Sequence, residues 1–180
     1  QKVQIGKNLT KGLGAGANSN VGKEAVEADK EAITTLLEGA DMVFITAGMG
    51  GGTGTGAAPV ISQVSRELGI LTVGIVTLPF SFEGPKRMNR ALDGMAEMKK
   101  ACDTLIAIPN QKLMTIVDKN TTLPEAFQMA DTILHQAAKG ISDLINVQGV
   151  INLDFADVET IMKNMGEAIM GTGTASGQER

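Results

Sequence analysis

Three short, uniformly apolar runs alternate with longer segments of helical period, and this alternation limits the possible folds more than any other feature of the chain. The runs span residues 42–47, 70–77 and 104–109, and they read MVFITA, ILTVGIVT and TLIAIP. Strands that are apolar on both faces are typical of parallel sheets covered by helices on each side. The sequence therefore predicts an α/β fold with a mostly parallel sheet, in which these runs form central strands.

The helical segments predicted around these strands span residues 21–37, 57–68 and 86–100. A longer helix is predicted from Leu123, because apolar residues recur there at steps of three and four. These residues are Leu123, Phe127, Ala130, Ile133, Leu134, Ala137, Ile141, Leu144 and Ile145. The pattern predicts a helix of about twenty residues or more. We also expect a further helix from about Val158 and a short strand, KVQI, at residues 2–5.

The composition is that of one globular domain with a packed core, since 43% of the 180 residues are hydrophobic and 20% are charged. A net charge of −4 and the absence of Trp and Tyr argue against a nucleic-acid-binding surface. No apolar run has the length of a membrane span and no signal peptide is visible, so we expect a cytoplasmic protein without direct membrane insertion. Cys102, the single cysteine, is expected to be a small buried thiol, and no Cys/His cluster has zinc spacing.

A glycine-rich run at residues 48–56 follows the predicted strand 42–47 and precedes the predicted helix 57–68. Open α/β sheets bind ligands at this position, beyond the carboxyl ends of their strands. Backbone without Cβ atoms can bring several N–H groups close to an anion. The helix dipole adds about 0.3–1 kcal/mol, and each amide bond to a charged oxygen about 1.5–3 kcal/mol. The run is therefore predicted to bind phosphate, and the alternative is a flexible linker or tight turn.

A second glycine-rich run, GLGAGAN at residues 12–18, likewise lies between a predicted strand and a predicted helix. Two such loops at one sheet edge suggest a polyphosphate that lies across it. The Walker A pattern is absent, because the nearest match at residues 16–23 has the wrong spacing. A dinucleotide pattern does occur at Gly52, Gly54 and Ala57, but the next strand ends in GIVTLPF without the acid that would hold a ribose. A dinucleotide oxidoreductase therefore stays a less favoured alternative.

Two acids, Asp154 and Asp157, lie three residues apart at the start of the last predicted helix. Their spacing lets both carboxylates face the same region. By itself such a pair is most often helix capping, because Asp is favoured at the N-cap and in the first turn.

The segment AGMGGGTGTGAAP at residues 47–59 contains the loop GGGTGTG, which resembles the tubulin signature, and the whole segment resembles the FtsZ family of tubulin-like cell-division GTPases. Further motifs stand in that family's order and spacing, so the resemblance covers essentially the whole chain. They are GLGAGAN, PFSFEGPKR at 79–87, IPNQKL at 108–113, AFQMAD at 126–131, GISDLI at 140–145 and NLDFADV at 152–158. Ser19 departs from the pattern, since the family usually has proline after GAGAN.

The resemblance implies a Rossmann-like GTPase fold with a long central helix and a pocket for GTP or GDP. The signature loop would take the phosphates, with Ala15 and Gly16 near the γ-phosphate and Mg²⁺ bound through the phosphates. Glu83 and Arg87 would contact the ribose side, Asn110 and Asp131 would read the guanine, and Phe127 would lie against its ring. The residues implied in the signature loop are Gly50, Gly51, Gly52, Thr53 and Gly54.

The resemblance further implies that Asp154 and Asp157, assisted by Asn152, reach into the nucleotide pocket of the next subunit and orient the attacking water. Polymerisation head to tail would then complete the GTPase site. The implied division is a partial GTP-binding domain at 1–122, a core helix at 123–147, a synergy loop at 148–157 and the start of a C-terminal activation domain at 158–180. The family normally begins with a further strand and glycine-rich loop, so we expect the chain to be a piece of a longer protein.

The function implied is GTP-dependent assembly into filaments of the bacterial cell-division ring at mid-cell. Division-machinery and membrane-tethering proteins would bind through a tail that this sequence does not contain. A tubulin-like filament for plasmid segregation is the near alternative, disfavoured by the NLDFADV and GMGGGTGTGAAP matches. The second alternative is a fragment that keeps the fold but neither binds nor hydrolyses GTP.

Overall fold

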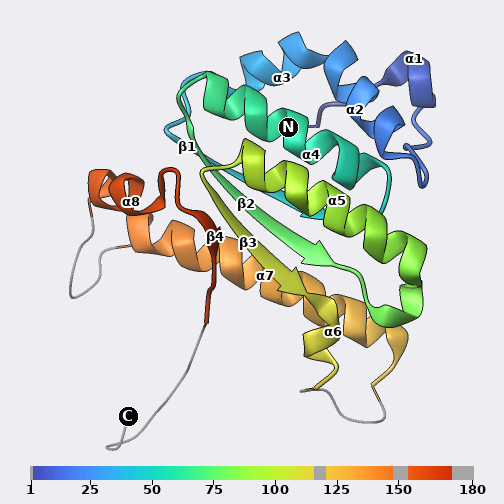
Figure 1. Ribbon diagram of the computed structural model, residues 1–180. Coiled ribbons are helices and arrows are strands. Elements are labelled where there is room, and N and C mark those ends of the chain that lie inside the picture. The colour runs from blue at the N-terminus through green and yellow to red at the C-terminus, as the bar shows by residue number, and fades with distance from the viewer. Residues whose placement is uncertain (1, 116–120, 148–153, 172–180) are drawn as a thin grey trace, which may run out of the picture.

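The computed structural model describes residues 2–115, 121–147 and 154–171, and its centre is a parallel sheet of four strands (Figure 1). The strands are β1 (Met42–Gly48), β2 (Leu71–Leu78), β3 (Thr104–Pro109) and β4 (Gly166–Ala168), and they lie in this order across the sheet. Each neighbouring pair is parallel. The predicted α/β fold and its three apolar strands are confirmed.

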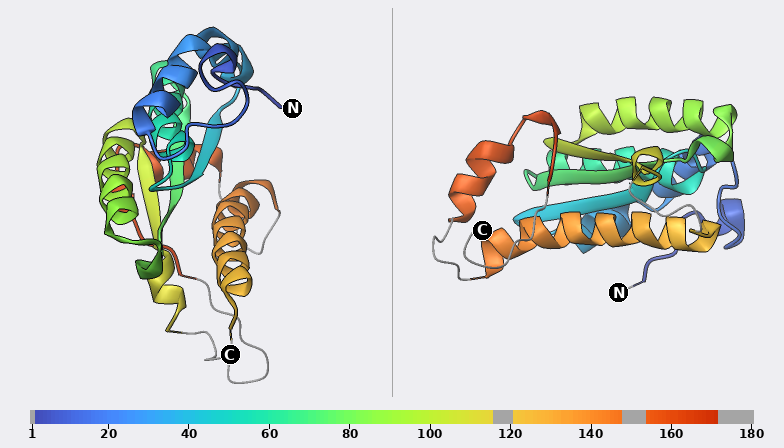
Figure 2. Two further views of the ribbon diagram at one scale, coloured as in Figure 1. Left: turned by 90° about the vertical axis from the view of Figure 1, so that its right-hand side faces the viewer. Right: turned by 90° about the horizontal axis from the view of Figure 1, so that it is seen from below.

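Helices cover both faces of the sheet (Figure 2). One face carries α4 (Thr53–Glu67) and α5 (Pro85–Ala101), with α2 (Ser19–Ala28) and α3 (Lys30–Leu37) packed outside α4. The other face carries α7 (Leu123–Asn146), the long helix that the apolar spacing predicts. The remaining elements are α1 (Lys7–Thr10), the 3₁₀ helix η1 (Ser81–Glu83), α6 (Asn110–Leu113) and α8 (Phe155–Met162). Among the described residues, no helix has both the length and the apolar character that crossing a membrane requires.

Strand β2 forms the centre of the core, because both of its faces are covered. Val73 and Ile75 point toward α7 and pack near Ile141, whereas Val76 points the other way and packs with Met98 of α5. This alternation follows from the two-residue period of a strand. Both faces of β2 are therefore buried, which accounts for the apolar residues that alternate along it.

Four features of the secondary structure differ from the predictions. The segment KVQI is not a strand, and Val3 is 38% exposed. The helix predicted over residues 21–37 breaks at Asp29, whose carboxylate accepts a hydrogen bond from the Gly6 amide at 2.7 Å. Helix α4 begins at Thr53, so half of the glycine run is helical. Strand β4 was not predicted, because three residues are too few to show a period.

The segment after α7 returns to the sheet. Strand β4 pairs with β3, so that Thr104 lies opposite Gly166 and Ile106 opposite Ala168. The expected boundary between residues 157 and 158 falls inside α8, and the strand beyond it joins the same sheet. The division of the chain into domains stays a prediction.

Candidate functional site

The two glycine-rich loops meet at the carboxyl edge of the sheet. Strand β1 ends at Gly48 and α4 begins at Thr53. The Gly52 amide donates a hydrogen bond to the Gly16 carbonyl at 2.8 Å, and the Ala15 amide donates to the Thr53 hydroxyl at 3.2 Å. The loop at 12–18 follows α1 rather than a strand, so the predicted strand before it is wrong. The predicted juxtaposition of the two loops is nevertheless present.

Glycine is needed at this junction because backbones approach closely. A Cβ atom on Gly52 would lie 2.6 Å from the Ala15 carbonyl oxygen and 2.8 Å from those of Gly16 and Asn18. A Cβ on Gly22 of α2 would collide with the Gly52 carbonyl. Distances this short are not found for real Cβ atoms. The run is thus a packed loop, and the flexible-linker alternative is wrong.

Several amides at the junction remain available to a ligand. Within the described part of the chain, the amides of Thr53 and Gly54 have no acceptor, since the first turn of a helix leaves its N–H groups unpaired, and the amide of Gly51, just before the N-cap, has none either. The Gly50 amide is not available to a ligand, because it donates a hydrogen bond to the Thr55 hydroxyl at 2.8 Å. Unpaired amides at the N-terminus of a fifteen-residue helix suit an anion, because the helix dipole also favours negative charge there.

A hollow of about 190 Å³ adjoins the loops, lined among others by Gly12, Gly14, Ala15 and Thr53. A larger groove of about 950 Å³ lies elsewhere, between α2, α4 and α5. Asn110, Phe127 and Asp131 do not line that groove. This groove is therefore not the predicted pocket for the guanine base.

The start of α5 adds charged side chains to the same edge. Arg87 packs over Gly50, so a Cβ there would lie 2.7 Å from both the Arg87 Cγ and its carbonyl oxygen. Arg90 Nε donates to the Gly50 carbonyl at 3.0 Å. Glu83 accepts a hydrogen bond from the Phe80 amide at 2.8 Å and pairs with Arg87 Nε at 3.1 Å. The two residues expected on the ribose side are therefore neighbours beside the glycine loop.

Asn110 begins α6 directly after β3 and is only 5% exposed. Its side-chain oxygen is buried without a hydrogen-bond partner in the described part of the chain. Buried polar atoms are nearly always paired, so an unpaired acceptor at the carboxyl end of a strand fits a residue that awaits a ligand.

Phe127 and Asp131 lie one helical turn apart on α7 and are both exposed. The Phe127 ring meets Phe80 and Phe82 edge to face, at centroid distances of 5.3 and 6.1 Å. This contact joins α7 to the segment that carries Glu83. Sequence reasoning assigned no role to Phe80 and Phe82, although the motif PFSFEG contains both, and none to Arg90, three residues beyond Arg87.

Asp154 and Asp157 lie at the opposite edge of the sheet. Their helix, α8, is held beside the first residue of β3, where the Thr104 hydroxyl donates to the Met162 carbonyl at 2.5 Å. Figure 1 shows α8 at the far end of the sheet from the start of α4. Both carboxylates are exposed, and Asp154 makes no capping hydrogen bond although it is the N-cap. Asn152 lies outside the described residues.

The fold and the loop geometry define an open parallel α/β protein with unpaired amides at a helix N-terminus beyond the carboxyl edge of its sheet. The model of the tubulin/FtsZ family, GTPase domain, matches residues 1–118, and the chain belongs to this family.

Solved structures agree with this assignment. An FtsZ dimer from M. jannaschii is 51% identical with a TM-score of 0.87, over 91% of this chain and 47% of that one. A point mutant of the same FtsZ gives 51% identity and a TM-score of 0.89, over 92% of this chain and 49% of that one. CetZ2 from Haloferax volcanii, solved as a GTPγS-bound protofilament, shares the fold at 21% identity and a TM-score of 0.76, over 93% of this chain and 49% of that one. The chain spans about half the length of each.

Proposed function

We propose that this chain binds GTP across the carboxyl edge of its sheet and hydrolyses it to GDP and phosphate as a subunit of a head-to-tail filament. One observation carries the proposal: the amide-lined glycine junction and the carboxylates of Asp154 and Asp157 lie at opposite edges of one parallel sheet. A pocket at one end of a subunit and acids at the other suit a site shared between two subunits.

The phosphates would lie on the free amides of Gly51, Thr53 and Gly54, with Ala15 and Gly16 beside the γ-phosphate. Hydrogen bonds to a charged oxygen contribute about 1.5–3 kcal/mol each, so several amides outweigh the helix dipole. Among the described residues, no three His, Cys, Asp or Glu side chains form a metal cluster. Mg²⁺ needs none when phosphates and water supply its ligands, and it would neutralise charge on the phosphates.

The guanine would lie against Phe127, between the buried amide of Asn110 and the carboxylate of Asp131. A carboxylate accepts from the N1–H and 2-amino groups of guanine and finds no such pair on adenine. Adenine in the same place would cover the Asp131 carboxylate without pairing it, which costs about 1–3 kcal/mol and supplies the discrimination. The exposed position of Asp131 and the unpaired oxygen of Asn110 both fit this role.

Hydrolysis would use Asp154 and Asp157 of the neighbouring subunit, assisted by Asn152, to hold water in line with the γ-phosphate. Phosphoryl transfer depends mainly on such placement and on charge neutralisation. A contact between unlike ends of two subunits that does not close into a ring generates a filament. Turnover would then require assembly.

The cellular role we propose is that of an FtsZ-type filament in the bacterial cell-division ring, with membrane tethers and division proteins as partners beyond this chain. Identity of 51% to FtsZ, against 21% to CetZ2, supports this over a more distant tubulin-like filament.

Equilibrium binding of GTP in the presence of Mg²⁺, with ATP and NAD as competitors, tests the pocket. We expect binding that neither competitor displaces. Displacement by NAD would favour the dinucleotide alternative, and no binding would show that this chain alone is an inactive fragment.

The substitution Asp157→Ala tests the acids. It should leave GTP binding unchanged and abolish turnover, because Asp157 lies at the far edge of its own subunit. Glu159→Ala on the same helix is the matched control, since Glu159 is paired with Lys163 at 2.8 Å and should be dispensable. Loss of binding with normal turnover per bound nucleotide would contradict the assigned role.

A further inference from the structure

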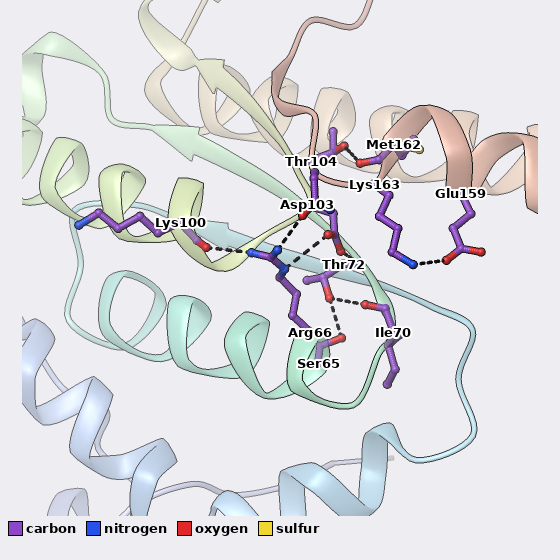
Figure 3. Close-up of polar contacts among 11 residues, drawn as sticks. Ser65, Arg66, Ile70, Thr72, Lys100, Asp103, Thr104, Glu159, Met162 and Lys163 are labelled. Atoms are coloured by element: carbon purple, nitrogen blue, oxygen red, sulfur yellow. Dashed lines mark hydrogen bonds and ion pairs between the residues drawn. The ribbon is translucent and has the colours of Figure 1, made fainter.

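Arg66, in the last turn of α4, contacts three acceptors in two segments at the amino edge of the sheet, residues 100–103 and the turn after α8 (Figure 3). Its Nε lies 3.4 Å from an Asp103 carboxylate oxygen, and one terminal nitrogen donates to the Lys100 carbonyl at 3.0 Å. The other terminal nitrogen donates to the Asn164 side-chain oxygen at 2.8 Å. A planar guanidinium presents its donors in a fixed fork, so this one side chain fixes the three acceptors relative to one another.

Asp103 is the buried member of this group, with a side chain 7% exposed. It accepts from the Thr72 amide at 2.9 Å, and its own carbonyl accepts from the Gly166 amide at 2.9 Å. Arg66 is its ion-pair partner within the described part of the chain. A buried charge must be paired, so the buried Asp103 carboxylate needs the Arg66 guanidinium as its partner.

Asn164 lies two residues beyond the end of α8, and its contact with Arg66 holds the C-terminal end of that helix. The bond from Thr104 to the Met162 carbonyl acts at the same end. Toward the other end, Val158 is buried, while Asp154 and Asp157 are exposed and Asp154 lacks a capping bond. The C-terminal bonds and the buried Val158 therefore hold α8 together, and the direction of this helix decides where the carboxylates point.

We propose that Arg66 is a positioning residue for hydrolysis, because through Asn164 it sets the direction of α8 and so the place at which Asp154 and Asp157 meet the next subunit's nucleotide. The proposal rests on the proposed function. Arg66 also connects the two ends of one subunit, since α4 begins at the glycine junction and has Arg66 in its last turn. A helix of fifteen residues spans about 22 Å.

The backbone of Asn164 permits a clean test. Its φ is +58°, a left-handed conformation that glycine adopts freely and that Asn and Asp tolerate. Asn164→Gly removes the acceptor and keeps the turn, whereas Asn164→Asp keeps both the acceptor and the turn. Lys163→Met is the control for the same segment, because Lys163 is paired with Glu159 at the surface.

The first readout is amide hydrogen exchange of residues 155–162, compared with α4 and β2 in the same sample. The second is GTP turnover, resolved into kcat and KM. In Asn164→Gly we expect faster exchange in α8 alone, and a kcat lowered by about 10- to 100-fold with KM unchanged, since misplacement by an ångström costs about that much. Asn164→Asp and Lys163→Met should match the unsubstituted chain.

A second variant, Arg66→Lys, keeps a positive charge near Asp103 but cannot reach all three acceptors, so it should also loosen α8 and lower kcat. The proposal fails if Asn164→Gly leaves both exchange and kcat unchanged, or if Asn164→Asp behaves like Asn164→Gly. A chain without any turnover would overturn the proposed function instead, and the exchange comparison would still decide whether Arg66 fixes α8.

Discussion

Asp131 stands exposed on α7 one turn beyond Phe127, and the proposed choice of base rests on this single carboxylate. Replacing it by Asn exchanges one acceptor for a donor. We expect Asp131→Asn to weaken GTP binding by about 10- to 100-fold, which corresponds to one lost charged hydrogen-bond interaction. Binding of xanthosine triphosphate should improve, because xanthine carries an oxygen where guanine carries the 2-amino group.

Equilibrium binding of both nucleotides to the variant checks this expectation. Asp143→Asn, nearer the other end of α7, is the control and should alter neither affinity. Equal affinities of the Asp131 variant and the unsubstituted chain for GTP would remove Asp131 from the base pocket.

At the scale of elements, the junction between the glycine loops depends on the missing side chain of Gly52. Gly52→Ala would drive a Cβ into three carbonyl oxygens, so we expect the free energy of unfolding to fall by about 1–3 kcal/mol. Gly51→Ala is the matched control, since a Cβ atom added at Gly51 would meet no other atom within 4 Å. Urea unfolding measures both, and equal stability of the two variants would show that the loops do not pack as described.

The elements that the sequence predicts well are those whose signal lies within the element. The strands at 42–47, 70–77 and 104–109 and the helix from Leu123 show their own apolar patterns, and all are confirmed. KVQI carries a strand-like pattern, but a strand also needs a neighbour, which nothing in its own residues supplies. The break at Asp29 depends on Gly6, a residue distant in sequence.

In the candidate site, too, the sequence predicts what depends on local residues and not what depends on distant ones. Glycine runs before helices predict an anion site from local chemistry alone, and the resemblance adds residues such as Asn110 and Asp131. Two individual contacts of the site could not be predicted. The hydrogen bond from Gly52 to Gly16 and the aromatic contact of Phe127 with Phe80 both join segments that are far apart in sequence, so only tertiary packing reveals them.

At the scale of the whole molecule, Cys102 reports on the integrity of the core. Burial raises the pKa of its thiol above the ordinary value, so the folded chain holds this proton more tightly than the unfolded chain. The resulting stability is fully present below the ordinary thiol pKa and is lost as the pH rises through the folded pKa. We expect the free energy of unfolding to fall over this range by up to about 1.4 kcal/mol per pH unit.

Urea unfolding at neutral and alkaline pH tests this, with Cys102→Ala as the control that lacks the thiol. The difference in stability between the two chains should change with pH in the stated direction. A difference that is independent of pH would show that the thiol is accessible to solvent in the folded chain.

The trans arrangement of pocket and acids is tested most directly by mixing two impaired chains, at a GTP concentration too low to fill the weakened Asp131→Asn pocket. Asp131→Asn impairs the pocket and leaves the acids, whereas Asp157→Ala impairs the acids and leaves the pocket. If the site forms between subunits, an equal mixture should regain about a quarter of the unsubstituted chain's GTP turnover, because half of the intact pockets meet an intact neighbour. Turnover no greater than the sum of the two variants measured separately would contradict a site shared between subunits.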